Sequence, residues 1–449
     1  MGSVVAVAIT VFCTIATVRT GARLFIAYWL GLCILQNTVA GLMSRVTAPQ
    51  VPFAETELKT VSLIVAVVVL WPAVRRVVRD GRLGLIAVLY IVLLLTQLRH
   101  PSTAGLGYLR NFLAPFLILV LGEALALGKT YLERLSLLQS TLAFVIGLLV
   151  VGLAFEMLIG TGPWRALLDA NHISALTSIS TQTRVFGVVV PRLAGFIVEP
   201  TNAGYIAAGG LAIILCSRRA IDEARPSRNY LVIWLFGAAL VGSMAKDGFL
   251  MVSLAIVAMV LLRRGVSGPK TILLVVCLGC AFLVMYLTLE IGPGGVVALI
   301  KSPTASVGGH STTYHAAGLV TGMRSLIVAP LGHGLGAGGN FTDLLNLDTA
   351  GLAGWIGTGA ESGFGAFCYQ TGIAGCILAP IAIARLARRY HYAGAALLAA
   401  WCGATLFHEA ILGPQAASLI LLGAGVLGGS RSLSETEPPI EVDSRSLQS

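Results

Sequence analysis

Thirteen apolar stretches separated by short polar connectors constrain this chain more than any other feature of its sequence. Hydrophobic residues make up 56% of the 449 residues and charged ones only 11%, whereas a soluble domain carries about 25% charged residues. The mean hydropathy of +0.87 points the same way, so the chain is predicted to be an integral membrane protein. The stretches are residues 3–18, 24–43, 60–74, 83–98, 111–127, 135–159, 203–217, 230–244, 248–262, 271–289, 364–384, 393–411 and 412–429.

The stretches lack the alternating ten-residue pattern of a membrane barrel, so they are expected to be helices. We predict an all-α fold, a polytopic transmembrane helical bundle of about 12–13 spans, with the last two in a hairpin through His408 and Glu409. A long outer loop is expected between the late spans. Residues 1–429 would form one integral membrane domain, and the polar residues 430–449 a disordered cytoplasmic tail.

Five basic connectors, one after every second apolar stretch, predict the orientation of the bundle. Basic residues accumulate on the cytoplasmic side of membrane proteins, which places residues 160–202 and 290–363 outside. The formal net charge of +10 therefore indicates contact with anionic membrane lipid and argues against a nucleic-acid partner. The basic residues are Arg75, Arg76, Arg79, Arg82, Lys129, Arg134, Arg218, Arg219, Arg225, Arg228, Arg263, Arg264, Lys270, Arg385, Arg388 and Arg389.

The longest polar interruption, Ser302–Gly375, is rich in glycine and lies between two blocks of spans. Long loops between spans are usually functional or disordered, so this stretch is predicted to carry chemistry. Its polar residues include His310, His315, His333, Arg324, Asp343, Asp348 and Glu361.

Three cations are expected at the outer membrane boundary: Arg192, Lys246 and Arg324. A charge near hydrocarbon is costly and usually faces a cavity and a partner, and the fork of arginine suits phosphate oxygens. The alternative for each is a side chain that extends to the lipid head groups or pairs with a neighbour, such as Lys246 with Asp247. Three such cations near different helix ends favour a functional group.

Glu199 and Glu361 each precede a predicted span, where an acid either caps the helix or acts as a general base. His315 and His333 compete for the role of base, since histidine titrates near neutral pH. No HExxH motif, Asp-x-Asp pair or G-x-S-x-G elbow is present, so neither a metal site nor a serine triad is predicted. We expect no cofactor, and the eight cysteines are interpreted as small packing residues.

Five motifs in order resemble those of the bacterial O-antigen polymerase and O-antigen ligase family, over nearly the whole chain. They are Arg192-x-x-Gly195-x-x-x-Glu199-Pro200-x-Asn202, Ser243-x-x-Lys246, Ser311…His315, Pro330-Leu331-Gly332-His333-Gly334-Leu335-Gly336, and Glu361-Ser362-Gly363…Gly372-Ile373-x-Gly375.

The resemblance implies a metal-independent glycosyltransferase of the bacterial plasma (inner) membrane, working on its outer side. Such enzymes transfer a glycan from a polyprenyl pyrophosphate, such as undecaprenyl pyrophosphate, to an acceptor hydroxyl with inversion. Carried over, Arg192 with Arg324 or Lys246 would hold the pyrophosphate, with Glu199 and Asn202 in support. Glu361 is the first choice of base. Proteins of envelope polysaccharide assembly would be partners.

Two positions depart from the family pattern. Lys246 stands where many relatives have arginine, and Glu361-Ser362 stands where ligases carry a His-Asn pair. The second departure favours a polymerase over a ligase that transfers a finished glycan to a lipid or protein. Two alternative functions come from other classes of protein. One is a secondary transporter or flippase, and the other is a scaffold for envelope assembly. The depth of the polar residues in the membrane distinguishes a transporter from a transferase, because a transporter needs these residues near the bilayer centre.

Overall fold

The computed structural model describes residues 2–44, 57–79, 84–99, 103–168, 182–185, 188–222, 226–302, 311–338 and 362–429. The predicted tail, residues 430–449, lies outside the described residues, as do His310, Asp343, Asp348 and Glu361.

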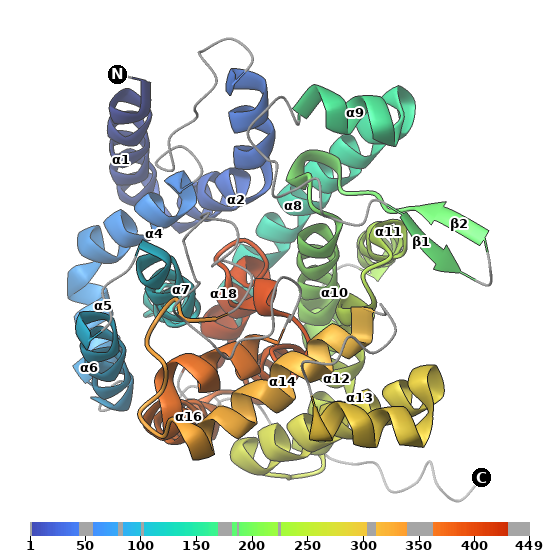
Figure 1. Cartoon of the computed structure of the whole chain (residues 1–449). Helices are drawn as coiled ribbons and strands as arrows, with labels where there is room; N and C mark the ends of the chain where they lie inside the picture. The colour runs from blue at the N-terminus through green and yellow to red at the C-terminus, as the bar shows by residue number, and fades with distance from the viewer. Residues whose placement is uncertain are drawn as a thin grey trace, which may run out of the picture.

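Every one of the thirteen apolar stretches contains a helix, which confirms the all-α prediction (Figure 1). Apart from the short α5, which carries three arginines, these helices are apolar on most of their circumference, as expected for segments that meet lipid or other spans on all sides. They are α1 Gly2–Thr20, α2 Ala22–Ser44, α4 Leu58–Val69, α5 Trp71–Arg79, α6 Gly84–Arg99, α7 Thr103–Ala126, α8 Tyr131–Ile159, α10 Pro200–Asp222, α11 Pro226–Ser243, α12 Lys246–Arg263, α13 Gly268–Lys301, α16 Gly363–Arg389, α17 Tyr392–Ala404 and α18 Ser418–Gly428.

Fewer helices meet the criteria of length and apolarity for a membrane span than the 12–13 spans predicted. Within the described residues, six helices are long and apolar enough to cross a membrane, or seven if the bent pair α4 and α5 is one span. The two helices of that pair meet at 79°. Four shorter apolar helices, within α1, α11, α17 and α18, fall below the length required.

Two of the segments predicted to lie outside contain structure that the sequence did not predict. Residues 160–202 contain α9 (Thr161–Leu168), the antiparallel strands β1 (Gln182–Val185) and β2 (Val188–Pro191), and a 3-10 turn, η1 (Gly195–Ile197). The segment expected to be a long loop contains α14, Ser311–Val328. Glycines on two helices permit this, because Gly322 of α14 lies against the backbone of Gly365 in α16 with no room for a Cβ atom.

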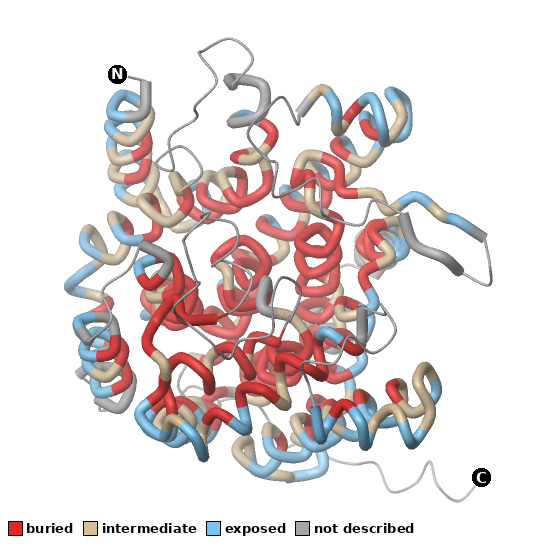
Figure 2. The backbone as a smooth tube through the Cα atoms, in the orientation of Figure 1, coloured by how far each residue is buried: buried red, intermediate tan, exposed pale blue. Residues whose placement is uncertain are grey.

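The core is centred on α18, which is buried along its whole length and contacts α7, α8, α10 and α17 (Figure 2). The last two predicted spans are present as the two short helices α17 and α18, which contact each other. Its connection runs from Thr405 to Ala417 and includes a second 3-10 turn, η2 (Glu409–Leu412). This connection brings polar side chains to the end of the core.

Four of the five basic connectors meet at one end of the bundle. Arg263 lies over the ring of Tyr392 at 5.9 Å, and the rings of Tyr131 and His391 are 5.2 Å apart. Cys216, near the end of α10, lies close to Arg263. The shared location agrees with the alternation from which the orientation is predicted.

Candidate active site

A short segment between β2 and α10 carries two of the predicted site residues, Arg192 and Glu199. Its backbone is hydrogen-bonded to other parts of the fold. Leu193 N–H donates to the Gly242 carbonyl at 2.8 Å. Farther on, Thr38 of α2 donates to the carbonyl of Phe196. Val198 adopts a left-handed conformation with φ of 73°, which is rare for a β-branched residue. The segment therefore has a fixed path between Arg192 and Glu199.

The buried carboxylate of Glu156, near the end of α8, anchors the middle of this segment. Its Oε2 accepts the N–H groups of both Ala194 and Gly195 at 2.7 Å, and the residue is 0% exposed. Glu156 also forms an ion pair with Arg165 at 3.4 Å. Glu156 was not predicted from the sequence, although an acid inside an apolar stretch is usually functional or paired.

Arg165 of α9 extends the same network to the first predicted cation. Its guanidinium donates to the backbone carbonyl of Arg192. Burial lowers the pKa of Arg165, while the neighbouring Glu156 opposes that shift, and the group stays charged at neutral pH. Trp164 donates to the Gly195 carbonyl at 3.1 Å. The backbone that carries Arg192 is thus positioned by α8 and α9.

The half-buried guanidinium of Arg192 lies between two helix ends. Its Nε donates to the Ser243 carbonyl at 3.1 Å, and its Nη2 donates to Thr201 Oγ1 at 3.2 Å. Ser243 ends α11, and Thr201 is in the first turn of α10. Gly204 of α10 has no room for a Cβ atom beside Ala245, so the α11–α12 turn lies directly against α10. The positive end of a helix and an arginine therefore meet at one place.

Glu199 and Asn202, the two predicted supporting residues, contact each other. Asn202 Nδ2 donates to Glu199 Oε2 and, at 3.3 Å, to Oε1 of Gln415. Gln415 lies in the α17–α18 connection and donates through Nε2 to the Cys33 carbonyl at 2.6 Å. Glu199 directly precedes α10 but its carboxylate is bonded to a side chain, so helix capping alone does not describe it. Sequence analysis missed Gln415.

Lys246 and Asp247, expected as a possible pair, have different partners. Lys246 is exposed and donates from Nζ to the Tyr286 hydroxyl on α13 at 3.1 Å. The Tyr205 hydroxyl of α10 donates to Asp247 Oδ2 at 3.3 Å. Lys246 therefore begins α12 beside the group formed by Arg192 and Asn202, with its ammonium directed to α13.

His315 lies in the first turns of α14, 5% exposed, and approaches the same end of the core. Its ring is 5.5 Å from that of His408, which in turn lies 6.2 Å from the ring of Tyr205. Ser362 forms the N-cap of α16, accepting from Gly365 N–H, and donates to the Leu406 carbonyl at 2.8 Å. The N-cap position of α16 is therefore filled by Ser362 rather than Glu361. His408 was named only as a turn residue from the sequence.

Two other predicted residues have partners elsewhere. Arg324 donates to the Lys301 carbonyl at 3.0 Å, and at ~1.5 Å per residue it lies about 13 Å along α14 from His315. The ring of His333 stacks on Tyr369, with centroids 4.1 Å apart. Tyr369 is about 10 Å along α16 from Ser362 at the same rise. His333 lies where the loop after α14 fastens to a break in α16 at Gly372.

A second charged group adjoins Glu199 from the amino-terminal half of the chain. Arg110 forms an ion pair with Glu57, and Lys59 is buried, close enough to Glu57, Arg110 and Glu199 for electrostatic interaction. Opposite charges in a poorly hydrated region stabilise one another. Lys59 therefore adjoins Glu199 from the amino-terminal half of the chain.

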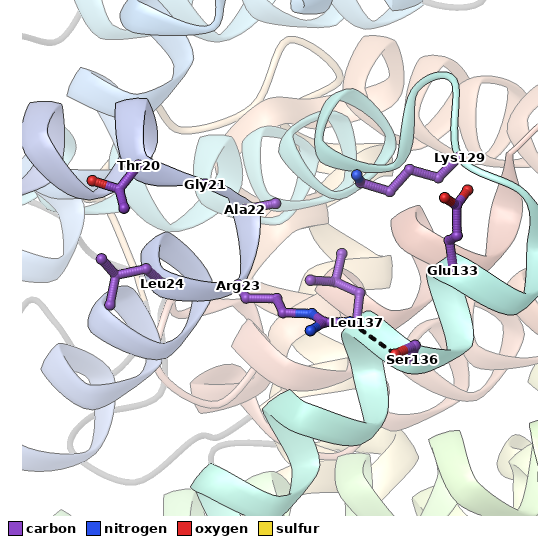
Figure 3. A pocket seen from close by; sticks show the side chains of 9 residues that line it. All are labelled: Thr20, Gly21, Ala22, Arg23, Leu24, Lys129, Glu133, Ser136 and Leu137. Carbon is purple, nitrogen blue, oxygen red and sulfur yellow. Dashed lines mark hydrogen bonds between the residues drawn. The ribbon is translucent and has the colours of Figure 1, made fainter.

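A cavity of about 450 Å³ lies away from these side chains. It is bounded by the α1–α2 turn and the start of α8, where Arg23 donates to Ser136 at 2.8 Å (Figure 3). Lys129 extends toward Ala22 across it. Since Lys129 belongs to a basic connector, this cavity is at the end predicted to be cytoplasmic and is not the predicted site.

No group of three or more His, Cys, Asp or Glu side chains that would hold a metal ion is present among the described residues. No protein-family model, curated protein or solved structure matches the chain, so its resemblance to the O-antigen polymerases and ligases rests on the sequence motifs.

Proposed function

We propose that the chain is an extracytoplasmic glycan polymerase that joins polyprenyl-pyrophosphate-linked oligosaccharides by inverting glycosyl transfer. The observation that carries this proposal is the position of Arg192. Its guanidinium is fixed by the Ser243 carbonyl and Thr201 Oγ1 at the positive end of α10, next to Glu199 and Asn202. A cation fixed at a helix N-terminus favours a phosphate group.

The proposed reaction needs stabilisation of the leaving group above all. The acceptor hydroxyl oxygen bonds to the anomeric carbon while the bond from that carbon to the pyrophosphate oxygen breaks. The electron pair leaves with the pyrophosphate, whose added charge Arg192 stabilises without having to move. Lys246 begins the adjacent helix and would add a second, more mobile cation.

A general base would take the proton from the acceptor hydroxyl. His315 has the support of location, because it lies beside His408 and, through that ring, Tyr205 of α10. Glu361 remains the prediction from the family motif. His333 and Arg324 contact other parts of the fold, so they are weaker members of the proposed site.

The test is genetic and uses the polysaccharide as its readout. Deleting the gene should shorten one surface polysaccharide to a single repeat on a gel, and the wild-type gene should restore the ladder. A gene encoding Arg192→Ala should not restore it at equal protein level. The matched control is Arg23→Ala, at the opposite end of the bundle, which should restore it fully.

Other outcomes would favour the rival functions. Loss of full-length polymer from its final acceptor, with polymer still made, would indicate a ligase. Unchanged polysaccharide in the deletion strain would overturn glycosyl transfer altogether. A transporter draws support from the break in α16, where buried Gln370 donates to the Gly338 carbonyl, since broken helices line transport sites. Arg192 and its partners Ser243 and Thr201 instead lie at the ends of helices α11 and α10, which favours a transferase.

A further inference from the structure

One oxygen in the candidate site is buried and has no donor among the described residues. It is Oδ1 of Asn202, on a residue that is 8% exposed. The amide nitrogen of the same side chain faces two acceptors, Glu199 Oε2 and Gln415 Oε1. Turning the amide over would bring its oxygen against both of those oxygens. The orientation of Oδ1 is therefore determined by the network around it.

The two groups that orient the amide are themselves held. Gln415 is fixed by its bond to the Cys33 carbonyl at 2.6 Å, and Glu199 adjoins the segment anchored by Glu156. A buried carbonyl oxygen without a donor is unfavourable, and such groups are usually satisfied by a protein group, a water or a ligand. Oδ1 of Asn202 is thus an oriented acceptor for which the described residues supply no donor.

The neighbouring Arg192, which would bind phosphate, limits the chemical groups that can donate to Oδ1. Arg192 donates to Thr201, the residue before Asn202, so a phosphate bound by Arg192 would lie at the first turn of α10, which also carries Asn202. An ionised pyrophosphate has acceptor oxygens and no hydrogen to donate. The sugar attached to it carries hydroxyl groups, which do donate. We propose that Asn202 binds a hydroxyl group of the glycan next to the pyrophosphate.

This inference rests on the proposed function, and it assigns separate tasks to adjacent residues. Arg192 binds the pyrophosphate that every lipid-linked glycan has in common, and Asn202 recognises the sugar. Glu199 and Gln415 act as positioning residues that orient the amide. Asn202 is therefore a determinant of binding for the glycan but not for the lipid pyrophosphate alone.

The experiment compares two probes on the purified full-length protein by titration in native mass spectrometry. One is undecaprenyl pyrophosphate without sugar, and the other is the lipid-linked single repeat extracted from the deletion strain. Asn202→Leu should weaken binding of the glycan-bearing probe about 3- to 10-fold, the effect of one lost hydrogen bond. Binding of the sugar-free probe should change less than about 2-fold. Arg192→Ala should weaken binding of both.

Asn37→Leu is the matched control, because Asn37 is an asparagine outside the proposed glycan contact that donates to the Ile197 carbonyl of the same segment. It should leave the ratio of the two affinities unchanged. Asn202→Ala, which adds no branched side chain, replaces the leucine variant if that variant does not fold.

The outcomes of this experiment distinguish a failure of glycan recognition by Asn202 from a failure of the proposed function. Equal weakening of both probes by Asn202→Leu, or no weakening of either, would overturn glycan recognition while leaving the proposed function standing. The unpaired oxygen would then be satisfied by water. A wild-type protein that binds neither probe more tightly than undecaprenol would instead overturn the proposed function and this inference with it.

Discussion

Removing the carboxylate of Glu156 should release the segment that carries Arg192. In Glu156→Leu, the N–H groups of Ala194 and Gly195 lose the acceptor that both share at 2.7 Å. A buried donor left unsatisfied costs about 1–3 kcal/mol, so two such donors cost about 2–6 kcal/mol. Arg165 loses its ion pair as well. This total is a large part of the stability of an ordinary domain.

Glu156→Gln separates the charge from the geometry. The amide retains an oxygen acceptor for the two N–H groups, but it loses the negative charge. A hydrogen bond to a charged group contributes about 1.5–3 kcal/mol and a neutral one about 0.5–1.5 kcal/mol. The glutamine variant should therefore lose about 2–3 kcal/mol over two bonds, less than the upper end of the range for the leucine variant.

The effect should be local, and hydrogen–deuterium exchange of residues 192–199 in detergent measures it. Exchange should rise from wild type to Glu156→Gln to Glu156→Leu, and polymer formation should fall in the same order. A displacement of about 1 Å at a catalytic group can cost about 100-fold in rate. Thermal unfolding, followed in parallel, shows how much of the change is global.

Glu133→Gln is the control, since Glu133 lies at the other end of α8 and is exposed. It accepts from Thr130 N–H and Oγ1 in a capping box. This change should alter neither exchange at residues 192–199 nor polymer. Wild-type exchange at those residues in Glu156→Leu would refute the anchoring role, whatever happens to the activity.

Four further predictions concern topology, cations and the base. Cysteine at position 306 should react with impermeant thiol reagents on intact cells and cysteine at position 227 should not; labelling at 227 would reverse the orientation. Arg192→Lys should restore only part of the polymer, because an ammonium lacks the bidentate fork. Arg324→Ala should lose less polymer than Arg192→Ala, since Arg324 is exposed and lies about 13 Å along α14 from His315. Glu361→Gln should retain lipid binding and lose turnover ~10²–10⁴-fold if Glu361 is the base; near-normal turnover there, with collapse in His315→Ala, would assign the role to His315.

Sequence reasoning located the helices because membrane spans are defined by local composition. A run such as residues 271–289 is apolar enough to need a helix, since its backbone has no other partner in lipid. The same reasoning placed the basic connectors, and four of them do share one end of the fold. It failed at residues 311–328, where glycines suggested a loop. Those glycines instead let α14 approach α16 closely.

The meeting of side chains at the candidate site was decided by the tertiary structure. Arg192, Asn202 and Gln415 come from segments up to 223 residues apart (192 to 415), and nothing in their spacing encodes that proximity. Helices that are apolar on all sides give no periodicity that tells which face packs inward. Contact is instead determined by the shapes of opposing helices, as where Gly204 admits the α11–α12 turn. For that reason Arg192 and Asn202 share a site, while Arg324 and His333, equally plausible from their motifs, bind to other parts of the fold.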